Sequence, residues 1–128
     1  VDEGGRLGTK QLFDANAART ELGARMRRFH QDYDILLTPA VAVTALPAGS
    51  MVPPGWPLGD NWFTWTPFSY PFNLTQQPAA SIPCGFTAAG LPVGLQIVGL
   101  HQRDDMVLRA ARAYETVYSI ADKRPPLT

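Results

Sequence analysis

Few side chains in this sequence could act as nucleophiles or general bases. Ser81 and the only cysteine, Cys84, lie in the stretch PAASIPCGFTAAGLPVGLQIVG at residues 78–99. A hydroxyl or a thiol becomes a useful nucleophile only when a base takes its proton. The two lysines, Lys10 and Lys123, lie near the chain ends, and no G-x-S-x-G motif surrounds Ser81. We therefore expect Ser81 to have a structural role.

Cys84 leaves two interpretations open. It could meet His30 or His101 in space, and a lone cysteine with a histidine is a legitimate catalytic pair. A small buried thiol between Pro83 and Gly85 is the commoner case. We expect the second.

Metal and phosphate chemistry have no sequence support. The two histidines are far apart, and neither an H-x-x-x-H nor a C-x-x-C pattern occurs. No glycine-rich run follows a strand and opens a helix, as a phosphate-binding loop would. The acidic pairs at 32/34 and 104/105 flank the ends of expected elements, where helix caps and solvated turns explain them. The sequence predicts no catalytic residue, metal ligand or cofactor-binding residue in this chain.

Bulk composition excludes several classes of partner. The 128 residues are 45% hydrophobic, which suffices for one core of ordinary size. Eleven basic and eleven acidic residues cancel, so a nucleic-acid partner is not expected. Apolar runs stop well short of the roughly 18 residues of a membrane span, and a single cysteine fits a reducing compartment. We expect a soluble, cytoplasmic protein with no membrane or nucleic-acid partner.

The opening residues VDEGGRLGTK contain neither an initiator Met nor a signal peptide and look like the interior of a longer protein. Next, residues 9–29 are expected to form a helix with one buried stripe, because apolar residues recur every three or four positions. The stripe comprises Leu12, Ala15, Ala18, Leu22, Met26 and Phe29. Its arginine-rich end suits a solvated helix C-terminus better than a nucleic-acid patch.

Residues 34–38 predict a short strand buried on both faces, which Pro39 ends. Residues 40–61 follow as a proline- and glycine-rich loop that can hold neither a continuous helix nor a central strand. Loops of this length within compact domains are usually lids, binding segments or disordered.

An aromatic segment at 62–75 is the most distinctive feature of the composition. Its rings are Trp62, Phe63, Trp65, Phe68, Tyr70 and Phe72. They could cap the core, or they could form one wall of a substrate pocket, because pockets are mostly apolar too. For the second interpretation we select Trp62, Trp65, Phe68 and Phe72 as substrate-binding candidates.

Residues 79–99 predict two strands joined by the turn TAAGL, with Gly85, Gly94 and Gly99 marking bulges, bends or close backbone approach. Alternation places Ala79, Ser81 and Pro83 on one face and Ala80, Ile82 and Cys84 on the other. A second long helix is expected at 104–121. Its apolar face comprises Val107, Ala110, Ala111, Tyr114, Val117, Tyr118 and Ala121. An N-cap at Asp104 and an ion pair between Asp105 and Arg109 are also expected. Together the elements predict an α/β fold, a mixed sheet flanked by helices.

Three stretches resemble the C-terminal portion of amidase signature family hydrolases. They are DYDILLTPA, then PFNLTQQPAASIPCGFTAAGLPVGLQIVG, then DDMVLRAARAYE, in the order and spacing of that family. The resemblance covers about residues 30–118. It implies an α/β/α layered domain of which residues 1–128 are the C-terminal segment. It also implies hydrolysis of a carboxylic amide to acid and ammonia or amine, without metal or organic cofactor.

The catalytic serine, its bridging serine at a cis peptide and the lysine base belong, in that family, to a Gly/Ser-rich signature that precedes this region. No stretch of this sequence matches the signature, so the resemblance places no catalytic residue here and implies that the isolated chain is inactive. Relatives commonly carry glycine after N-L-x, where this chain has Gln76. That departure puts a close backbone approach in doubt.

The sequence leaves three functions open. A general amidase is favoured, because WTPFSYPFN looks unlike the corresponding stretch of the glutamyl-tRNA amidotransferase protein that belongs to the same family. That amidotransferase component is the alternative within the family, and a non-catalytic module that binds a small molecule or peptide is the alternative outside it. The expected partner is a small-molecule amide. A sheet cut from a larger domain is also expected to self-associate through its exposed edge.

Overall fold

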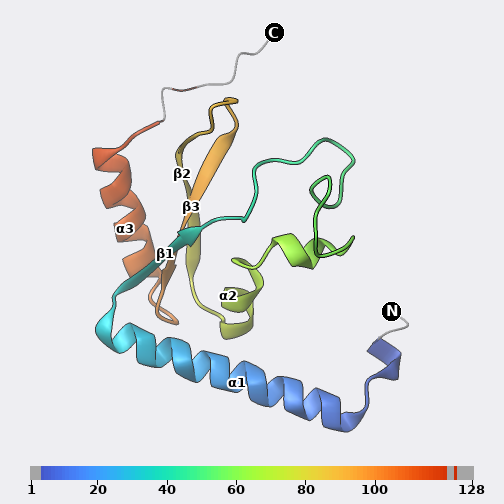
Figure 1. The fold of residues 1–128 in the computed structure, drawn as a ribbon. Coiled ribbons are helices and arrows are strands. Elements are labelled where there is room, and N and C mark those ends of the chain that lie inside the picture. Colours follow the sequence, from blue (N-terminus) through green and yellow to red (C-terminus); the bar gives the residue numbers. More distant parts are fainter. Residues whose placement is uncertain (1–3, 121–122, 124–128) are drawn as a thin grey trace.

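The computed structural model describes residues 4–120 and 123, which form helices around one antiparallel sheet (Figure 1). In chain order the elements are η1 (Gly4–Arg6), α1 (Thr9–Asp32), β1 (Ile35–Pro39), η2 (Trp62–Trp65), α2 (Tyr70–Thr75), β2 (Ala79–Phe86), β3 (Pro92–Gly99) and α3 (Asp104–Val117). η1 and η2 are 3-10 helices. The predicted α/β class is confirmed.

The sheet has the strand order β1-β3-β2, and both strand pairs are antiparallel. β3 therefore lies in the centre, although β1 and β3 are far apart in the sequence. A mixed sheet would also contain parallel pairs, and the described part of the chain contains none.

β2 and β3 form a hairpin whose irregularities occur at glycines, as predicted. Gly90 has a φ of 79° in the connecting turn, a conformation that favours glycine. The ladder shifts register between Pro83 and Gly85, which leaves Cys84 as the extra residue of a β-bulge.

α3 covers one face of the sheet and forms the main core with it. Val107 of α3 packs against Ile82 and Ile97. Partly buried residues surround this cluster: Ile35, Ala80, Leu95, Ala110, Ala111 and Tyr114. The predicted placement of Ala80 and Ile82 on one face is thus confirmed. At Gly99 a Cβ atom would lie 2.7 Å from Val107 Cγ2, so the close approach of α3 depends on glycine.

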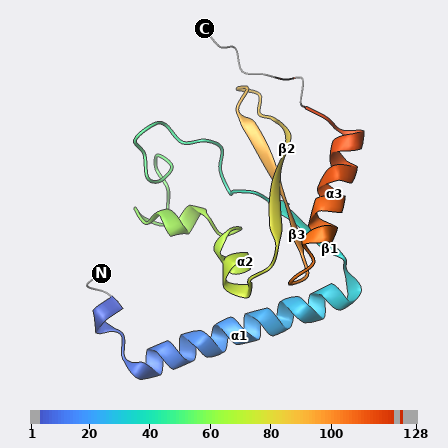
Figure 2. The same ribbon diagram turned by 180° about the vertical axis from the view of Figure 1, so that it is seen from behind.

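α1 crosses the end of the sheet at which β2 begins and β3 ends (Figures 1 and 2). Arg19 Nε donates a hydrogen bond to the carbonyl of Leu74 over 2.8 Å, which ties α1 to α2. The expectation of one buried stripe along α1 is wrong for its first half. Leu12 is 61% exposed, whereas Met26 and Phe29 are partly buried. The N-terminal half projects beyond α2 and the sheet, so these elements do not cover it (Figure 2).

Two further expectations need correction. β1 is an edge strand rather than a strand buried on both faces, and Leu37 is 57% exposed. α3 ends at Val117 rather than at 121, and Val117 is 89% exposed instead of lying on the buried face. The last residue of the expected apolar face, Ala121, lies outside the described residues.

The start of α3 also differs in detail. Arg103, not Asp104, occupies the N-cap position, and Asp105 pairs with Arg103 rather than with Arg109. None of the helices in the described ranges combines the length and the apolar character that a membrane crossing requires.

Candidate substrate-facing site

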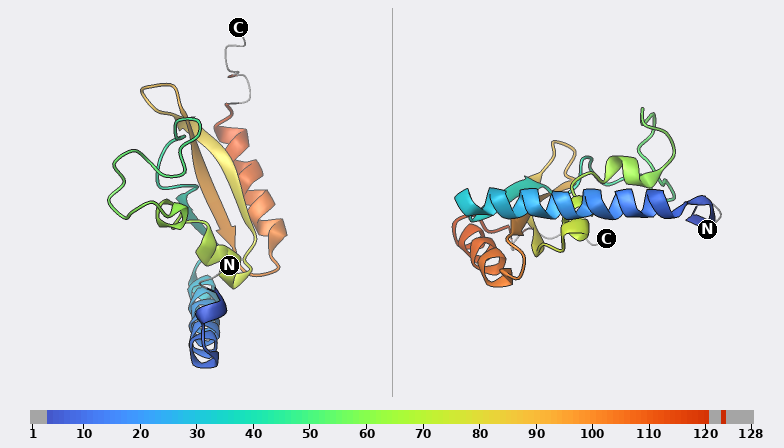
Figure 3. Two further views of the ribbon diagram at one scale, coloured as in Figure 1. Left: turned by 90° about the vertical axis from the view of Figure 1, so that its right-hand side faces the viewer. Right: turned by 90° about the horizontal axis from the view of Figure 1, so that it is seen from below.

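The sheet face opposite α3 carries a row of three polar residues. The strand register places Thr38 of β1 and Ser81 of β2 on either side of Gln96 in β3. Side chains in register on neighbouring antiparallel strands point to the same face. The segment at 40–75, with η2 and α2, lies on this side of the sheet, away from α3 (Figure 3). The polar row therefore faces the aromatic segment.

Gln96 connects this row to the aromatic segment. Its Nε2 donates to Thr38 Oγ1 over 2.9 Å and to the carbonyl oxygen of Phe68 over 2.8 Å. Two residues before Gln96 in β3, the carbonyl of Gly94 accepts a hydrogen bond from the Ala40 amide at 2.9 Å. A Cβ atom at Gly94 would lie 2.9 Å from Ala40 Cβ. The loop after β1 therefore begins in close contact with the sheet.

The four substrate-binding candidates occupy different environments. Trp62 begins η2 and is 45% exposed, and its ring stacks on Phe63 with centroids 4.0 Å apart. Trp65 and Phe68 are partly buried. Phe72 lies in α2 and is only 8% exposed, as expected of a core residue. Trp62 is thus exposed, Trp65 and Phe68 are partly exposed, and Phe72 is buried.

Two tryptophan side chains fix the proline-rich loop to the aromatic segment. Trp65 Nε1 donates to the carbonyl oxygen of Met51 over 2.9 Å, and Trp56 Nε1 donates to Thr64 Oγ1 over 2.8 Å. The hydroxyl of Thr64 in turn donates to the Asn61 carbonyl. Tryptophan N–H groups usually find such a partner when the ring is partly buried. The loop and the aromatic segment are therefore joined by side-chain hydrogen bonds.

Ser81 and Cys84 have no base beside them in the described part of the chain. Cys84 Sγ donates to the carbonyl of Val93 over 3.4 Å, and Ser81 is exposed without a lysine or histidine partner. Lys10 pairs with Asp14 on α1, and Lys123 lies 5.6 Å from the centre of the Phe86 ring. Within the described residues, neither side chain has the environment of an activated nucleophile. The thiol of Cys84, expected to be buried, is only partly buried.

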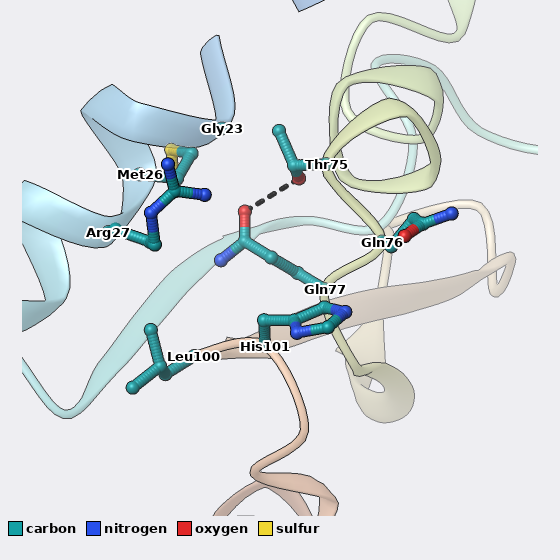
Figure 4. Close-up of a pocket in the computed structure, with 8 residues that line it drawn as sticks. All are labelled: Gly23, Met26, Arg27, Thr75, Gln76, Gln77, Leu100 and His101. Atoms are coloured by element: carbon teal, nitrogen blue, oxygen red, sulfur yellow. Dashed lines mark hydrogen bonds between the residues drawn. The ribbon is translucent and has the colours of Figure 1, made fainter. Parts of the chain in front are cut away.

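His30, one of the two histidines considered as partners of Cys84, belongs to a polar junction at the end of the sheet. Its Nδ1 lies 2.9 Å from the Tyr33 carbonyl oxygen, and its Nε2 lies 3.0 Å from Gln77 Nε2. Gln77 also donates to the Gly99 carbonyl. It accepts a hydrogen bond from Thr75 Oγ1, which Figure 4 shows. These bonds join α1, the α2–β2 connection and β3. The ring nitrogens of His30 are thus occupied by contacts that join structural elements, and neither contact involves Cys84.

A small cavity of about 170 Å³ adjoins this junction. Figure 4 shows its lining, which comprises Gly23, Met26, Arg27, Thr75, Gln76, Gln77, Leu100 and His101. Gln76 adopts a left-handed backbone with φ 58° as the C-cap of α2. The residue that departs from the family pattern therefore occupies a conformation for which glycine is the usual choice.

Sequence reasoning missed Gln77 and Gln96, the two glutamines that join separate elements. A signal existed for Gln96, because it is the one polar residue in the apolar run GLQIVG. A buried amide requires hydrogen-bond partners, so such a residue points to a partner from elsewhere in the fold. Within the described ranges, no three histidine, cysteine or acidic side chains come together in a way that could hold a metal ion.

Known proteins with similar sequences identify the family of this chain. The model of the amidase family matches residues 4–108. An acylamidase from Rhodococcus erythropolis is 39% identical over 128 residues, which is 98% of this chain and 27% of that protein. The A component of a glutamyl-tRNA(Gln) amidotransferase from Halothermothrix orenii is 34% identical over 113 residues, 88% of this chain and 23% of that protein.

A solved structure shows the same relationship in three dimensions. The structure of 6-aminohexanoate cyclic dimer hydrolase complexed with substrate superposes with a TM-score of 0.81 at 25% identity, covering 98% of this chain and 28% of that one. The chain thus spans about a quarter of the length of these relatives. Both the sequence pattern and the arrangement of sheet and helices show that this chain belongs to the amidase family.

Proposed function

We propose that this chain is the C-terminal part of an amidase that hydrolyses a carboxylic amide to an acid and ammonia or an amine. The observation that carries the proposal is the 39% identity with an acylamidase over 98% of the chain. In the proposed reaction a serine hydroxyl supplied by upstream polypeptide adds to the amide carbonyl, and a Ser-Ser-Lys relay takes its proton. The C–N bond then breaks as the leaving nitrogen gains a proton, and water releases the acid from the acyl ester.

This chain would contribute one wall of the acyl pocket. Apolar surface of the aromatic segment, including the exposed ring of Trp62 and part of the ring of Trp65, lies over the polar row of the sheet. Such a mixture is typical of small-molecule sites. No base stands beside Ser81 or Cys84 in the described part of the chain, so these residues offer no activated nucleophile. The single cysteine fits the reducing cytoplasm, where we place the protein.

The first experiment expresses the complete open reading frame that contains this chain, alongside residues 1–128 alone. The complete protein should hydrolyse simple acyl amides, with acid and amine detected by mass spectrometry, whereas residues 1–128 should be inactive. The frame should also encode a Gly/Ser-rich signature with a serine and a lysine upstream of Val1. A frame without that signature, or turnover by residues 1–128 alone, would overturn the proposal.

A second experiment tests the pocket wall. Trp62→Ala should raise KM for bulky acyl groups about tenfold, because a lost apolar contact is worth roughly 1 to 2 kcal/mol. The matched control is Phe13→Ala, which removes another aromatic ring, 71% exposed, from α1. Equal effects of the two substitutions would remove Trp62 from the site.

The A component of a glutamyl-tRNA amidotransferase is the second candidate, favoured by the 34% identity with the Halothermothrix orenii protein. It predicts that the complete protein copurifies with a partner chain and requires an ammonia donor. Activity of the complete protein on simple amides without a partner would exclude it.

A further inference from the structure

Gln96 is a polar residue at the centre of an otherwise apolar strand. The next two residues, Ile97 and Val98, are 2% and 0% exposed. β3 pairs with a neighbour on both sides, so Gln96 cannot turn out to solvent at a sheet edge. A partly buried carboxamide lowers stability unless its hydrogen bonds are made. Its presence here therefore requires specific partners.

The partners fix the orientation of the carboxamide. The Phe68 carbonyl can only accept a hydrogen bond, so the group 2.8 Å away must be the amide nitrogen of Gln96. Thr38 Oγ1 donates to the Pro39 carbonyl over 3.0 Å, which leaves its lone pairs for the second hydrogen of Gln96 at 2.9 Å. Both amide hydrogens are thus used, one on the sheet and one on the aromatic segment.

The backbone acceptor, the carbonyl of Phe68, lies between two short helices. Phe68 stands between η2 (Trp62–Trp65) and α2 (Tyr70–Thr75), where the two short helices meet. The other tethers described above hold this region to the proline-rich loop and to α1. The bond from Gln96 attaches it to the sheet. The bond joins residues 28 positions apart and ends on the main chain, so it links the backbone at Phe68 directly to the central strand.

We infer that Gln96 is a positioning residue that holds the aromatic wall of the acyl pocket at a fixed place on the sheet. The inference rests on the proposed function for the identity of the pocket, whereas the tether itself rests on the contacts alone. Gln96 acts without touching the reacting atoms. Its effect passes through the main chain at Phe68 to the rings that would contact the acyl group.

The test of the tether uses hydrogen–deuterium exchange of the chain. Gln96→Met keeps the length of the side chain and removes its donors, so amides of 62–75 should exchange about tenfold faster than in the unchanged chain, as expected for the loss of about one hydrogen bond. Exchange in α3 should stay the same. The control is Ser81→Ala, a change in the same row of the sheet at an exposed residue, which should leave 62–75 unaffected. Unchanged exchange at 62–75 in Gln96→Met would overturn the inference.

If Gln96→Met fails to fold, Thr38→Val is the second variant. It removes the hydroxyl that accepts one hydrogen bond from Gln96, and it leaves Gln96 and Phe68 unchanged. It should produce a smaller increase in exchange over the same residues, and Thr38→Ser should restore the original rate. Exchange at 62–75 that is equal in Thr38→Val and the unchanged chain would then count against the tether.

Kinetics of the complete protein separate positioning from a general structural role. Gln96→Met should raise KM for bulky acyl amides about tenfold while kcat changes less than about threefold. Partial misfolding would instead lower kcat and leave KM unchanged. If the unchanged protein hydrolyses amides and Gln96→Met alters no KM, the inference fails and the proposed function stands. If the unchanged protein hydrolyses no amide, the proposed function fails, and the exchange experiment alone decides the tether.

Discussion

Gln77 Nε2 lies 3.0 Å from His30 Nε2 and 2.8 Å from the carbonyl oxygen of Gly99. A carboxamide nitrogen only donates, so His30 Nε2 accepts and its ring hydrogen is on Nδ1, 2.9 Å from the Tyr33 carbonyl oxygen. The hydrogen-bond network thus selects one neutral tautomer of His30. Through it, the end of α1 is attached to the end of β3.

Removing this junction should lower the stability of the fold. Gln77→Leu leaves the His30 ring nitrogen and the Gly99 carbonyl without their donor, so the free energy of unfolding should fall by about 1 to 3 kcal/mol. Urea denaturation followed by circular dichroism measures the change. The control Gln31→Leu alters an exposed glutamine near the end of α1 and should have little effect. Equal midpoints for the two variants would contradict a role for the junction.

The close approach of α3 to β3 predicts that Gly99 tolerates no side chain. An alanine Cβ there would lie 2.7 Å from Val107 Cγ2 and 3.3 Å from the Arg103 carbonyl oxygen. Gly99→Ala should therefore lower the melting temperature, at a cost of about 1 to 3 kcal/mol. Gly5→Ala is the control, because nothing lies within 4 Å of the Cβ that it would add. Equal melting temperatures of Gly99→Ala and Gly5→Ala would disprove the clash.

Gln76 offers a stabilising substitution. Its φ of 58° at the C-cap of α2 suits glycine better than a residue with a Cβ atom. Gln76→Gly should raise the free energy of unfolding by about 0.5 to 1 kcal/mol, measured by denaturant titration. Asn73→Gly, inside the same helix, should have the opposite sign because glycine disfavours helical backbone. A loss of stability in Gln76→Gly would show that the side chain of Gln76 matters more than its backbone.

The ion pair at the start of α3 predicts a pH effect at one carboxyl group. Arg103 donates to both oxygens of Asp105, at 2.9 and 3.1 Å, and this hydrogen bonding lowers the pKa of Asp105. Because the folded-state pKa is the lower one, the pair stabilises the fold above the unfolded pKa. The contribution disappears as the pH falls through the folded value.

Arg103→Gln should move the pKa of Asp105 upward, as a carbon-13 NMR titration of the carboxyl group would show. The control Arg28→Gln breaks the separate pair with Glu21 and should leave the Asp105 titration unchanged. A titration of Asp105 that is identical in both variants would remove Arg103 as the cause.

The exposed edge of β1 predicts self-association of the chain. Leu37 of this edge strand is 57% exposed, and Leu108 of α3 is 66% exposed. Unpaired strand edges and contiguous apolar surface favour pairing with a second copy. Sedimentation should show dimers or larger species, and Leu37→Lys should reduce them more than Leu12→Lys on the exposed half of α1. A strictly monomeric profile at high concentration would be the contrary result.

The sequence alone determined the elements with strong local signals. Apolar spacing of three to four residues predicted the helices that α1 and α3 form, and Gly85 and Gly90 marked the bulge and the turn of the hairpin. These features depend on backbone conformation and nearby residues, so their causes can be read locally. The family pattern likewise lies in short motifs of fixed spacing.

Only the tertiary structure decided which surfaces meet. The second half of α1 is partly buried, whereas its first half is exposed. β1 lies at the edge of the sheet beside β3. The tertiary structure also brought Gln96 to Phe68 over 28 positions and Gln77 to His30 over 47. Such contacts depend on strand register and helix docking. Local propensity does not encode them, because the conformational preferences of a glutamine are the same whichever distant residue becomes its hydrogen-bond partner.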